Sequence, residues 1–150
     1  MIDWDYTEKG NHRPITLIFA KEKSLESMKE ALFKGRTVAV YNSLLVGKSE
    51  YLKPLLQSSV IIESAGYLSE TTVLKVVLKN ISSSDLLFEN QMEFNFYDSS
   101  PIFEINAGET ITVHIKTLEK LDTVALKLKA LGAFTAPKQQ PLIEWEILID

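Results

Sequence analysis

The sequence TLIFAKEKSLESMKEALFKGRTVAVY, residues 16–41, decides the fold of this part of the chain, because it has the pattern of strand, capped helix and strand. Thr16–Ala20 is an apolar run of strand length. Ser24 stands at the N-cap, where its hydroxyl can accept a hydrogen bond from the free N–H groups of the first helical turn. Gly35 stands where a helix end needs left-handed backbone, and Thr37–Tyr41 resumes as a strand.

Between these caps Leu25, Met28 and Leu32 recur at helical spacing, which predicts one helix with a single apolar stripe. Parallel strands need a crossover helix, so the pattern predicts a β-α-β unit. One such unit is small for a domain. Its apolar residues are therefore expected to need covering, and we expect a homo-oligomer through this exposed α/β face. These residues are Phe19, Leu25, Met28, Leu32 and Val38.

Composition limits the classes of function. The chain has 150 residues, 45% of them hydrophobic, a net charge of −4 and no cysteine. One ordinary domain or two small ones fit this length. The acidic balance and the lack of a basic stripe argue against a nucleic-acid or anionic-membrane partner. Disulfides and thiolate metal sites are excluded. We expect a soluble chain without an export signal or membrane span, and whether Met1 is the native start stays open.

Both flanks of the central unit are expected to be irregular. Met1–Pro14 is polar, contains the turn signal Lys9-Gly10-Asn11, and is predicted to be a loop leading into the first strand. Asn42–Lys48 is predicted to be a turn with a short apolar piece. Ser49 can cap a short helix through Gln57, which we expect to be broken or bent near Pro54 because proline lacks an N–H donor.

From Val60 onward the apolar period is mostly two, which predicts about seven or eight short strands of an antiparallel sandwich. An alternative is a helix over Leu118–Leu131, although the alternation of Lys127 and Lys129 with leucines favours a strand. The predicted strands are Val60–Ser64, Thr72–Leu78, Leu86–Phe88, Met92–Phe96, Phe103–Ile105, Thr110–Thr117, Thr123–Leu131 and Leu142–Ile149.

The predicted fold class is therefore α+β and mostly β. A small β-α-β remnant over residues 1–57 is expected to pack on an antiparallel sandwich over residues 58–150. The junction near Gln57–Val60 has no Gly/Ser-rich linker, so the two parts are expected to pack on each other.

Candidate chemical residues are few. A metal-dependent hydrolase needs several converging His, Asp or Glu ligands, and this chain has two histidines, His12 and His114. His114 is expected to face solvent in a strand, in a structural role. Asp3 and Asp5 share a face of an extended segment and can in principle hold a cation, although a solvated acidic terminus is the favoured interpretation. No catalytic, cofactor-binding or metal-binding residue is predicted.

Two further patterns are interpreted as structural. Val46-Gly47-Lys48-Ser49 is similar to the end of a P-loop, but the first glycine of that motif is replaced by Asn42 and no turn from a strand into a long helix is expected. Arg36 and Glu50 are interpreted as surface charges. The aromatic residues of the β part are interpreted as sandwich core rather than a ligand site: Phe88, Phe94, Phe96, Phe103 and Trp145.

The run HRPITLIFAKEKSLESMKEALFKGRTVAVYNSLLVGKSEYLKPLL, His12–Leu56, resembles the C-terminal segment of PHP-family (polymerase and histidinol phosphatase) metal-dependent phosphoesterases. The features are the strand TLIFA, the AKE after it, the helix SLESMKEAL and then GRTVAVYN. Ile2–Tyr6, IDWDY, resembles the residues just after the closing Asp-x-His of that family. Such relatives end in an immunoglobulin-like sandwich, which fits Val60–Asp150 with its NAGETITVHI turn and strand.

The resemblance implies that the family's metal ligands lie upstream of this chain, so that no position here corresponds to one. His12 and Arg13 are then expected near the mouth of such a site. The chain is expected to be the non-catalytic C-terminal part of a phosphoesterase, inactive alone and without a cofactor. The alternative is a stand-alone immunoglobulin-like binding or protein-interaction module. Because such relatives are often exported, the resemblance also implies an extracytoplasmic longer form.

Overall fold

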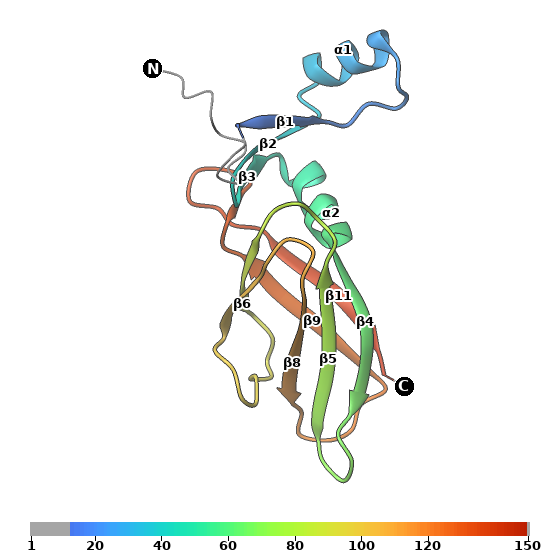
Figure 1. The fold of residues 1–150 in the computed structure, drawn as a ribbon, viewed down its shortest axis with the longest axis vertical. Helices are drawn as coiled ribbons and strands as arrows, with labels where there is room; N and C mark the ends of the chain where they lie inside the picture. The colour runs from blue at the N-terminus through green and yellow to red at the C-terminus, as the bar shows by residue number, and fades with distance from the viewer. Residues whose placement is uncertain (1–12, 150) are drawn as a thin grey trace.

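The computed structural model describes residues 13–149 (Figure 1), so the predicted N-terminal loop, His12, Asp3 and Asp5 lie outside the described residues. In chain order the elements are β1 (Ile15–Ile18), α1 (Leu25–Phe33), β2 (Thr37–Tyr41), β3 (Leu44–Gly47), α2 (Ser49–Ser59), β4 (Val60–Tyr67), β5 (Val73–Asn80), β6 (Leu86–Asn90), β7 (Ile102–Ile105), β8 (Thr110–Lys116), β9 (Thr123–Ala130), β10 (Ala133–Phe134) and β11 (Leu142–Leu148).

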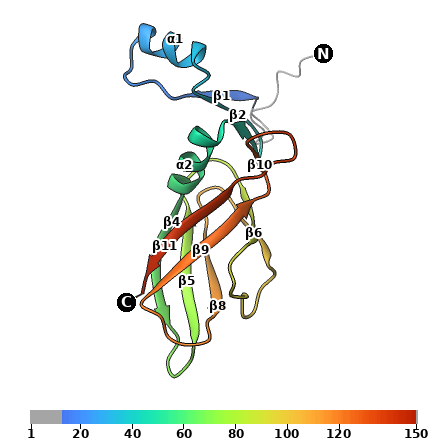
Figure 2. The same cartoon turned by 180° about the vertical axis from the view of Figure 1, so that it is seen from behind.

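These strands form three sheets. Two of them, with strand orders β4-β5-β8 and β11-β9-β6-β7, lie face to face as an antiparallel sandwich of seven strands, as Figures 1 and 2 show. The third sheet, β1-β2-β3-β10, lies at one end of the sandwich together with both helices. The prediction of a mostly β chain containing an antiparallel sandwich is therefore confirmed.

Helix α1 begins and ends where the sequence predicts. The Ser24 hydroxyl accepts a hydrogen bond from the Ser27 N–H at 3.2 Å. At the other end Gly35 has a φ of +63°, and the N–H of Arg36 donates to the C=O of Ala31 at 2.9 Å. This is a Schellman ending, in which glycine takes the left-handed position.

The prediction of a parallel β-α-β unit is wrong. β1 pairs with β2 in antiparallel register, and the N–H of Phe19 donates to the C=O of Arg36 at 2.9 Å. The chain therefore leaves β1 and enters β2 at the same end of the sheet. Helix α1 lies in the connection between β1 and β2 and does not cross the face of the sheet, as Figure 1 shows. The strand–helix–strand pattern specifies the elements, but it does not fix the relative direction of the two strands, which depends on whether the connection crosses the sheet.

Helix α2 is also longer than predicted, because it continues through Pro54 to Ser59. The N-cap residue is Lys48, not Ser49, and it makes no side-chain capping bond. Leu52 and Leu56, one turn apart, are buried in the core. Burial of these two leucines holds the helix together across the backbone bond that Pro54 removes.

Most of the predicted strands are present, including Thr123–Ala130 where a helix was the alternative. Met92–Phe96 is the exception. The side chains of Met92, Phe94 and Phe96 pack on the core, but this segment is irregular and only Phe96 forms a bridge, with Ile115 of β8. Strand β10 was not predicted. It pairs parallel with β3, so a segment that follows the sandwich strand β9 completes the N-terminal sheet.

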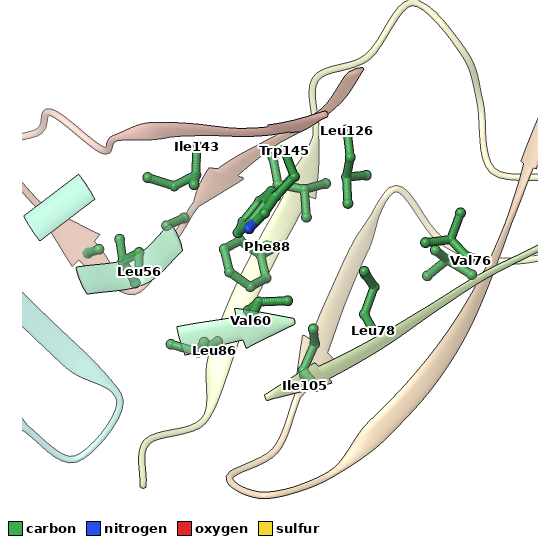
Figure 3. Packing of buried hydrophobic residues seen from close by; sticks show 14 of the residues in the cluster. Leu56, Val60, Val76, Leu78, Leu86, Phe88, Ile105, Leu126, Ile143 and Trp145 are labelled. Atoms are coloured by element: carbon green, nitrogen blue, oxygen red, sulfur yellow. The ribbon is translucent and has the colours of Figure 1, made fainter. Parts of the chain in front are cut away.

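The core runs without interruption from the sandwich into α2 (Figure 3). Phe88 of β6 lies at its centre, with the ring of Trp145 edge-on at a centroid distance of 6.1 Å. Leu56 of α2 and Ile143 of β11 belong to the same cluster. The buried aromatic and aliphatic side chains therefore form one core under both parts of the chain.

Helix α2 joins the two parts directly. Its last residue, Ser59, is followed without a linker by β4. The indole N–H of Trp145 donates to the C=O of Gln57 at 3.1 Å, and the amide of Gln57 donates to the C=O of Glu144 at 2.9 Å. The expected stiff junction is thus fixed by packing and by two hydrogen bonds to β11.

Candidate functional site

The clearest candidate site is the outward side of α1. Leu25, Met28, Leu32 and Phe33 are exposed by 64%, 41%, 50% and 91%, whereas Ala31 on the opposite side is fully buried. We call these four exposed side chains the α1 surface. The helix lies at the end of the molecule away from the sandwich (Figure 1). Exposed apolar groups of this kind on a surface helix make it a candidate interaction site.

The α1 surface contains three of the five residues expected to need covering, Leu25, Met28 and Leu32. Val38 is fully buried in the core, and the ring of Phe19 stacks on Tyr51 of α2 at 5.6 Å. Phe33, which the helical stripe did not include, is the most exposed apolar residue of the helix. The spacing of the stripe was predicted correctly, but the small residues Ser27 and Ala31 face the protein instead.

Charged residues near the C-terminal end of α1 are paired. The ammonium of Lys34 lies 2.6 Å from a carboxylate oxygen of Glu30, and the guanidinium of Arg36 lies 3.4 Å from the other oxygen. The hydrogen bond and charge of Lys34 lower the pKa of Glu30 below its ordinary value of 4.5. Glu30 therefore stays ionised and neutralises two cations beside the helix end.

Arg36 is not the surface charge that was predicted. Its side chain is 14% exposed, and its Nε and Nη2 atoms are buried without a well-aligned hydrogen bond. Glu50, by contrast, is exposed as predicted. Near Arg36, burial and the charge of Glu50 raise the pKa of Tyr51 above 10.0.

The segment similar to a P-loop end follows a strand and opens α2, an 11-residue helix that is longer than the short helix expected there. β3 ends at Gly47 and α2 begins at Ser49. However, the Lys48 ammonium is turned to the C-terminal end of α1, where it donates to the C=O of Lys34 at 3.3 Å. A Cβ on Gly47 would lie 2.7 Å from the Val38 side chain, so this glycine serves close strand packing. The geometry supports the interpretation of a chance resemblance.

His114 lies on β8 as predicted, and its partner is a residue that the sequence did not identify. Nδ1 of His114 lies 2.8 Å from a carboxylate oxygen of Asp98, which belongs to the loop between β6 and β7. This pair fastens the loop to the edge of the sheet. Within residues 13–149 no three His, Asp or Glu side chains are grouped so as to hold a metal ion.

The aromatic side chains of the β part are core, as interpreted. The ring of Phe103 lies 6.0 Å from that of Phe88 and 5.4 Å from that of Phe96.

No helix within the described part of the chain is long and apolar enough to cross a bilayer.

Comparison with protein families finds one model, DUF5001, described as an Ig-like domain, which matches residues 60–146. This range contains all seven strands of the sandwich except the last residues of β11. No curated protein matches the chain.

Among solved structures the chain is similar to a two-domain protein from Bacteroides vulgatus ATCC 8482 that contains a predicted PHP-like metal-dependent phosphoesterase. The TM-score is 0.78 at 24% sequence identity, over 97% of this chain and 41% of that protein. The chain thus spans about two fifths of its structural relative, and the likeness establishes a shared fold. Together the two comparisons support both parts of the resemblance, the PHP-like relative and the Ig-like domain.

Proposed function

The chain belongs to the DUF5001 family of Ig-like domains, and from this premise we propose that it is the non-catalytic C-terminal part of a longer PHP-like phosphoesterase. In this proposal residues 1–57 form the C-terminal piece of the PHP-like barrel and residues 58–150 form the appended immunoglobulin-like sandwich. The α1 surface supports the proposal, because four apolar side chains exposed at one end of the molecule are suited to packing against a further structure.

The sequence upstream of Met1 tests the attachment. An open frame that encodes a barrel and ends in Asp-x-His directly before Met1 is the expected result. A stop codon in frame immediately upstream contradicts the proposal.

Because relatives of this kind are often exported, we also propose that the longer protein lies outside the cytoplasm. The same upstream sequence is then expected to begin with a signal peptide.

We propose further that the chain by itself has no hydrolase activity and needs no cofactor. The support is the sequence, in which no position corresponds to a family metal ligand and His12 and His114 are far apart. Phosphomonoester and phosphodiester assays with added divalent metals are expected to show no turnover. Turnover that is lost in His12→Ala and kept in His114→Gln would contradict this expectation.

In isolation the α1 surface is expected to be covered by a second copy of the chain, since neither nucleic acid nor a membrane fits its charge and composition. Light scattering should then show a mass that rises with protein concentration. Phe33→Glu should abolish the rise because it places a charge in the apolar contact. Leu118→Glu is the matched control, since Leu118 is 92% exposed in the loop between β8 and β9.

A strict monomer at high concentration counts against self-association while leaving attachment to a longer protein in place. The alternative function, a stand-alone Ig-like binding or interaction module, is favoured by the family match alone. It predicts that Met1 is the native start. It also predicts that Phe33→Glu weakens binding to a partner in the native host.

A further inference from the structure

Two charged side chains on α1 have no partner within residues 13–149. Glu26 and Lys29 are both exposed, and the side chain of neither forms an ion pair or a hydrogen bond with another described residue. The neighbouring carboxylate differs, because Glu30 pairs with both Lys34 and Arg36. Glu26 and Lys29 are therefore available to charges on another molecule.

These two charges border the α1 surface. In a helix, residues three or four positions apart are neighbours on the same side. Lys29 is therefore next to Leu25 and Leu32, and Glu26 is next to Lys29. The carboxylate comes first along the helix and the ammonium follows it, so the two charges give this apolar surface a direction.

The direction of the charges selects the orientation of a second copy. In two parallel helices in register, Glu26 would face Glu26 and Lys29 would face Lys29, and like charges repel. An antiparallel pair can instead place Leu25 of one copy beside Leu32 of the other. Glu26 is then level with Ala31 of the other copy, about 3 Å along the axis from Lys29 at a rise of about 1.5 Å per residue. Opposite charges meet twice in this arrangement, and the two helix dipoles also attract each other.

We propose that two copies of this chain pair through their α1 surfaces with the helices antiparallel, about a two-fold axis near Met28. Leu25 of each copy lies beside Leu32 of the other. Glu26 of each copy lies beside Lys29 of the other. Such a contact closes at two copies, because both contribute the same residues. The proposal rests on the self-association expected of the α1 surface under the proposed function, and it adds which residues meet.

The rest of the molecule leaves room for this contact. Helix α1 lies at the end of the molecule away from the sandwich (Figure 1), so a second helix can approach it without meeting the sandwich. The inward side of α1 is already covered, because Ala31 is fully buried. On the same side the hydroxyl of Ser27 accepts from the N–H groups of Lys21 and Glu22 at 3.0 and 3.3 Å. The helix therefore presents the α1 surface without rearrangement, which lowers the cost of association.

The size of the contact predicts a weak dimer. Helix α1 has nine residues, and four of its apolar side chains are exposed. A standard interface buries about 800 Å² on each partner, and one short helix provides less than this area. We therefore expect a dimer that forms at high protein concentration and dissociates on dilution.

Disulfide cross-linking tests the pairing, because the chain has no cysteine of its own. Met28→Cys should give a linked dimer on mild oxidation, since residues near the axis come within the reach of a disulfide, about 4.4–6.8 Å between Cα atoms. Ser99→Cys, in the exposed loop between β6 and β7, is the control and should cross-link at the rate of random collision. Equal rates for the two variants would overturn the proposal.

Mixing two variants distinguishes antiparallel from parallel helices. Leu25→Cys and Leu32→Cys should cross-link with each other several-fold faster than either does with itself. An affinity tag on one variant identifies the mixed product by its mass. Self-linkage of Leu25→Cys as fast as the mixed reaction indicates parallel helices and rules out the proposed orientation.

Charge exchange tests the contact between Glu26 and Lys29. Glu26→Lys and Lys29→Glu should each raise the dissociation constant several-fold in analytical ultracentrifugation, because each substitution brings like charges together. The double variant should return to the native dissociation constant, since it restores opposite charges across the axis. A double variant that associates no better than either single variant contradicts the contact.

The outcomes separate this pairing from the proposed function. A dimer with the wrong cross-linking pattern overturns the antiparallel pairing and leaves self-association in place. A strict monomer overturns both. Attachment to a longer phosphoesterase is judged by the sequence upstream of Met1, and neither outcome changes that test.

Discussion

At the scale of single residues, the Asn80 side chain joins several loop segments at one end of the sandwich by hydrogen bonds. It is fully buried at the end of β5, and its amide donates to the C=O groups of Ser84 and Ile105 at 2.8 and 2.9 Å. Its oxygen accepts from the N–H and the hydroxyl of Ser82. One side chain thus provides hydrogen-bond partners for backbone groups of the loop after β5 and of the end of β7.

Asn80→Ala should lower the free energy of unfolding by roughly 2–4 kcal/mol, because it leaves buried C=O groups without donors. Urea denaturation followed by tryptophan fluorescence measures the change. Ser99→Ala is the exposed control. A loss below about 0.5 kcal/mol, the usual range for surface substitutions, would mean that water replaces the amide.

Glu30 gives a second residue-scale prediction, on pH. Its pKa is lowered mainly by Lys34, so its pairing stabilises α1 above the ordinary pKa of 4.5. That stabilisation is lost as the pH falls from 4.5 through the lowered pKa. An NMR titration of the Glu30 carboxyl should show this lowered pKa, and Lys34→Met should return it toward 4.5. An unchanged titration in Lys34→Met contradicts the assigned cause.

At the scale of elements, α2 carries an internal proline at an exposed position. Pro54 removes the hydrogen bond to the C=O of Glu50, and the helix continues because Leu52 and Leu56 are buried on both sides of it. The missing N–H of Pro54 alone therefore predicts a break in the helix, but the burial of the two leucines keeps the helix continuous.

Pro54→Ala should raise the free energy of unfolding by about 1–3 kcal/mol, since it restores a helical donor and removes the steric conflict. Part of the gain is offset because alanine loosens the unfolded chain. The measurement is the urea concentration at the midpoint of unfolding, compared between the two proteins with the same m-value. A destabilised variant would contradict this expectation and would show that the restriction of the unfolded chain by Pro54 outweighs the lost hydrogen bond.

The sequence predicted elements well where their signals are local. Ser24 and Gly35 bound α1 by hydrogen bonds within a few residues, and alternation places β5, β8, β9 and β11. The antiparallel direction of β1 and β2, the pairing of β10 with β3 and the His114–Asp98 contact join distant segments, so no local pattern specifies them. The α1 surface was recognised from its spacing, but its outward orientation depends on Ala31 packing inward.

At the scale of the whole molecule, the N-terminal sheet and the sandwich share a core. Leu56 belongs to it from α2, and Ala133 of β10 belongs to it from the C-terminal part of the chain. The two parts should therefore unfold in one transition, with coincident changes in circular dichroism and in Trp145 fluorescence.

Leu56→Ala should lower the free energy of unfolding by about 2–5 kcal/mol and keep the transition single. The comparable change at an exposed site, Leu118→Ala, should have little effect. Two separated transitions in the native protein would show instead that residues 1–57 and 58–150 are independent units.

The direct passage of α2 into β4 has a mechanical consequence. A helix that becomes a strand without an intervening residue, and is bonded to β11 on its way, cannot act as a hinge. The distance and the angle between the N-terminal part, which carries α1, and the β4–β5 turn at the far end of the sandwich are then fixed (Figure 2). Whatever binds the α1 surface has its orientation relative to the far tip of the sandwich set in advance.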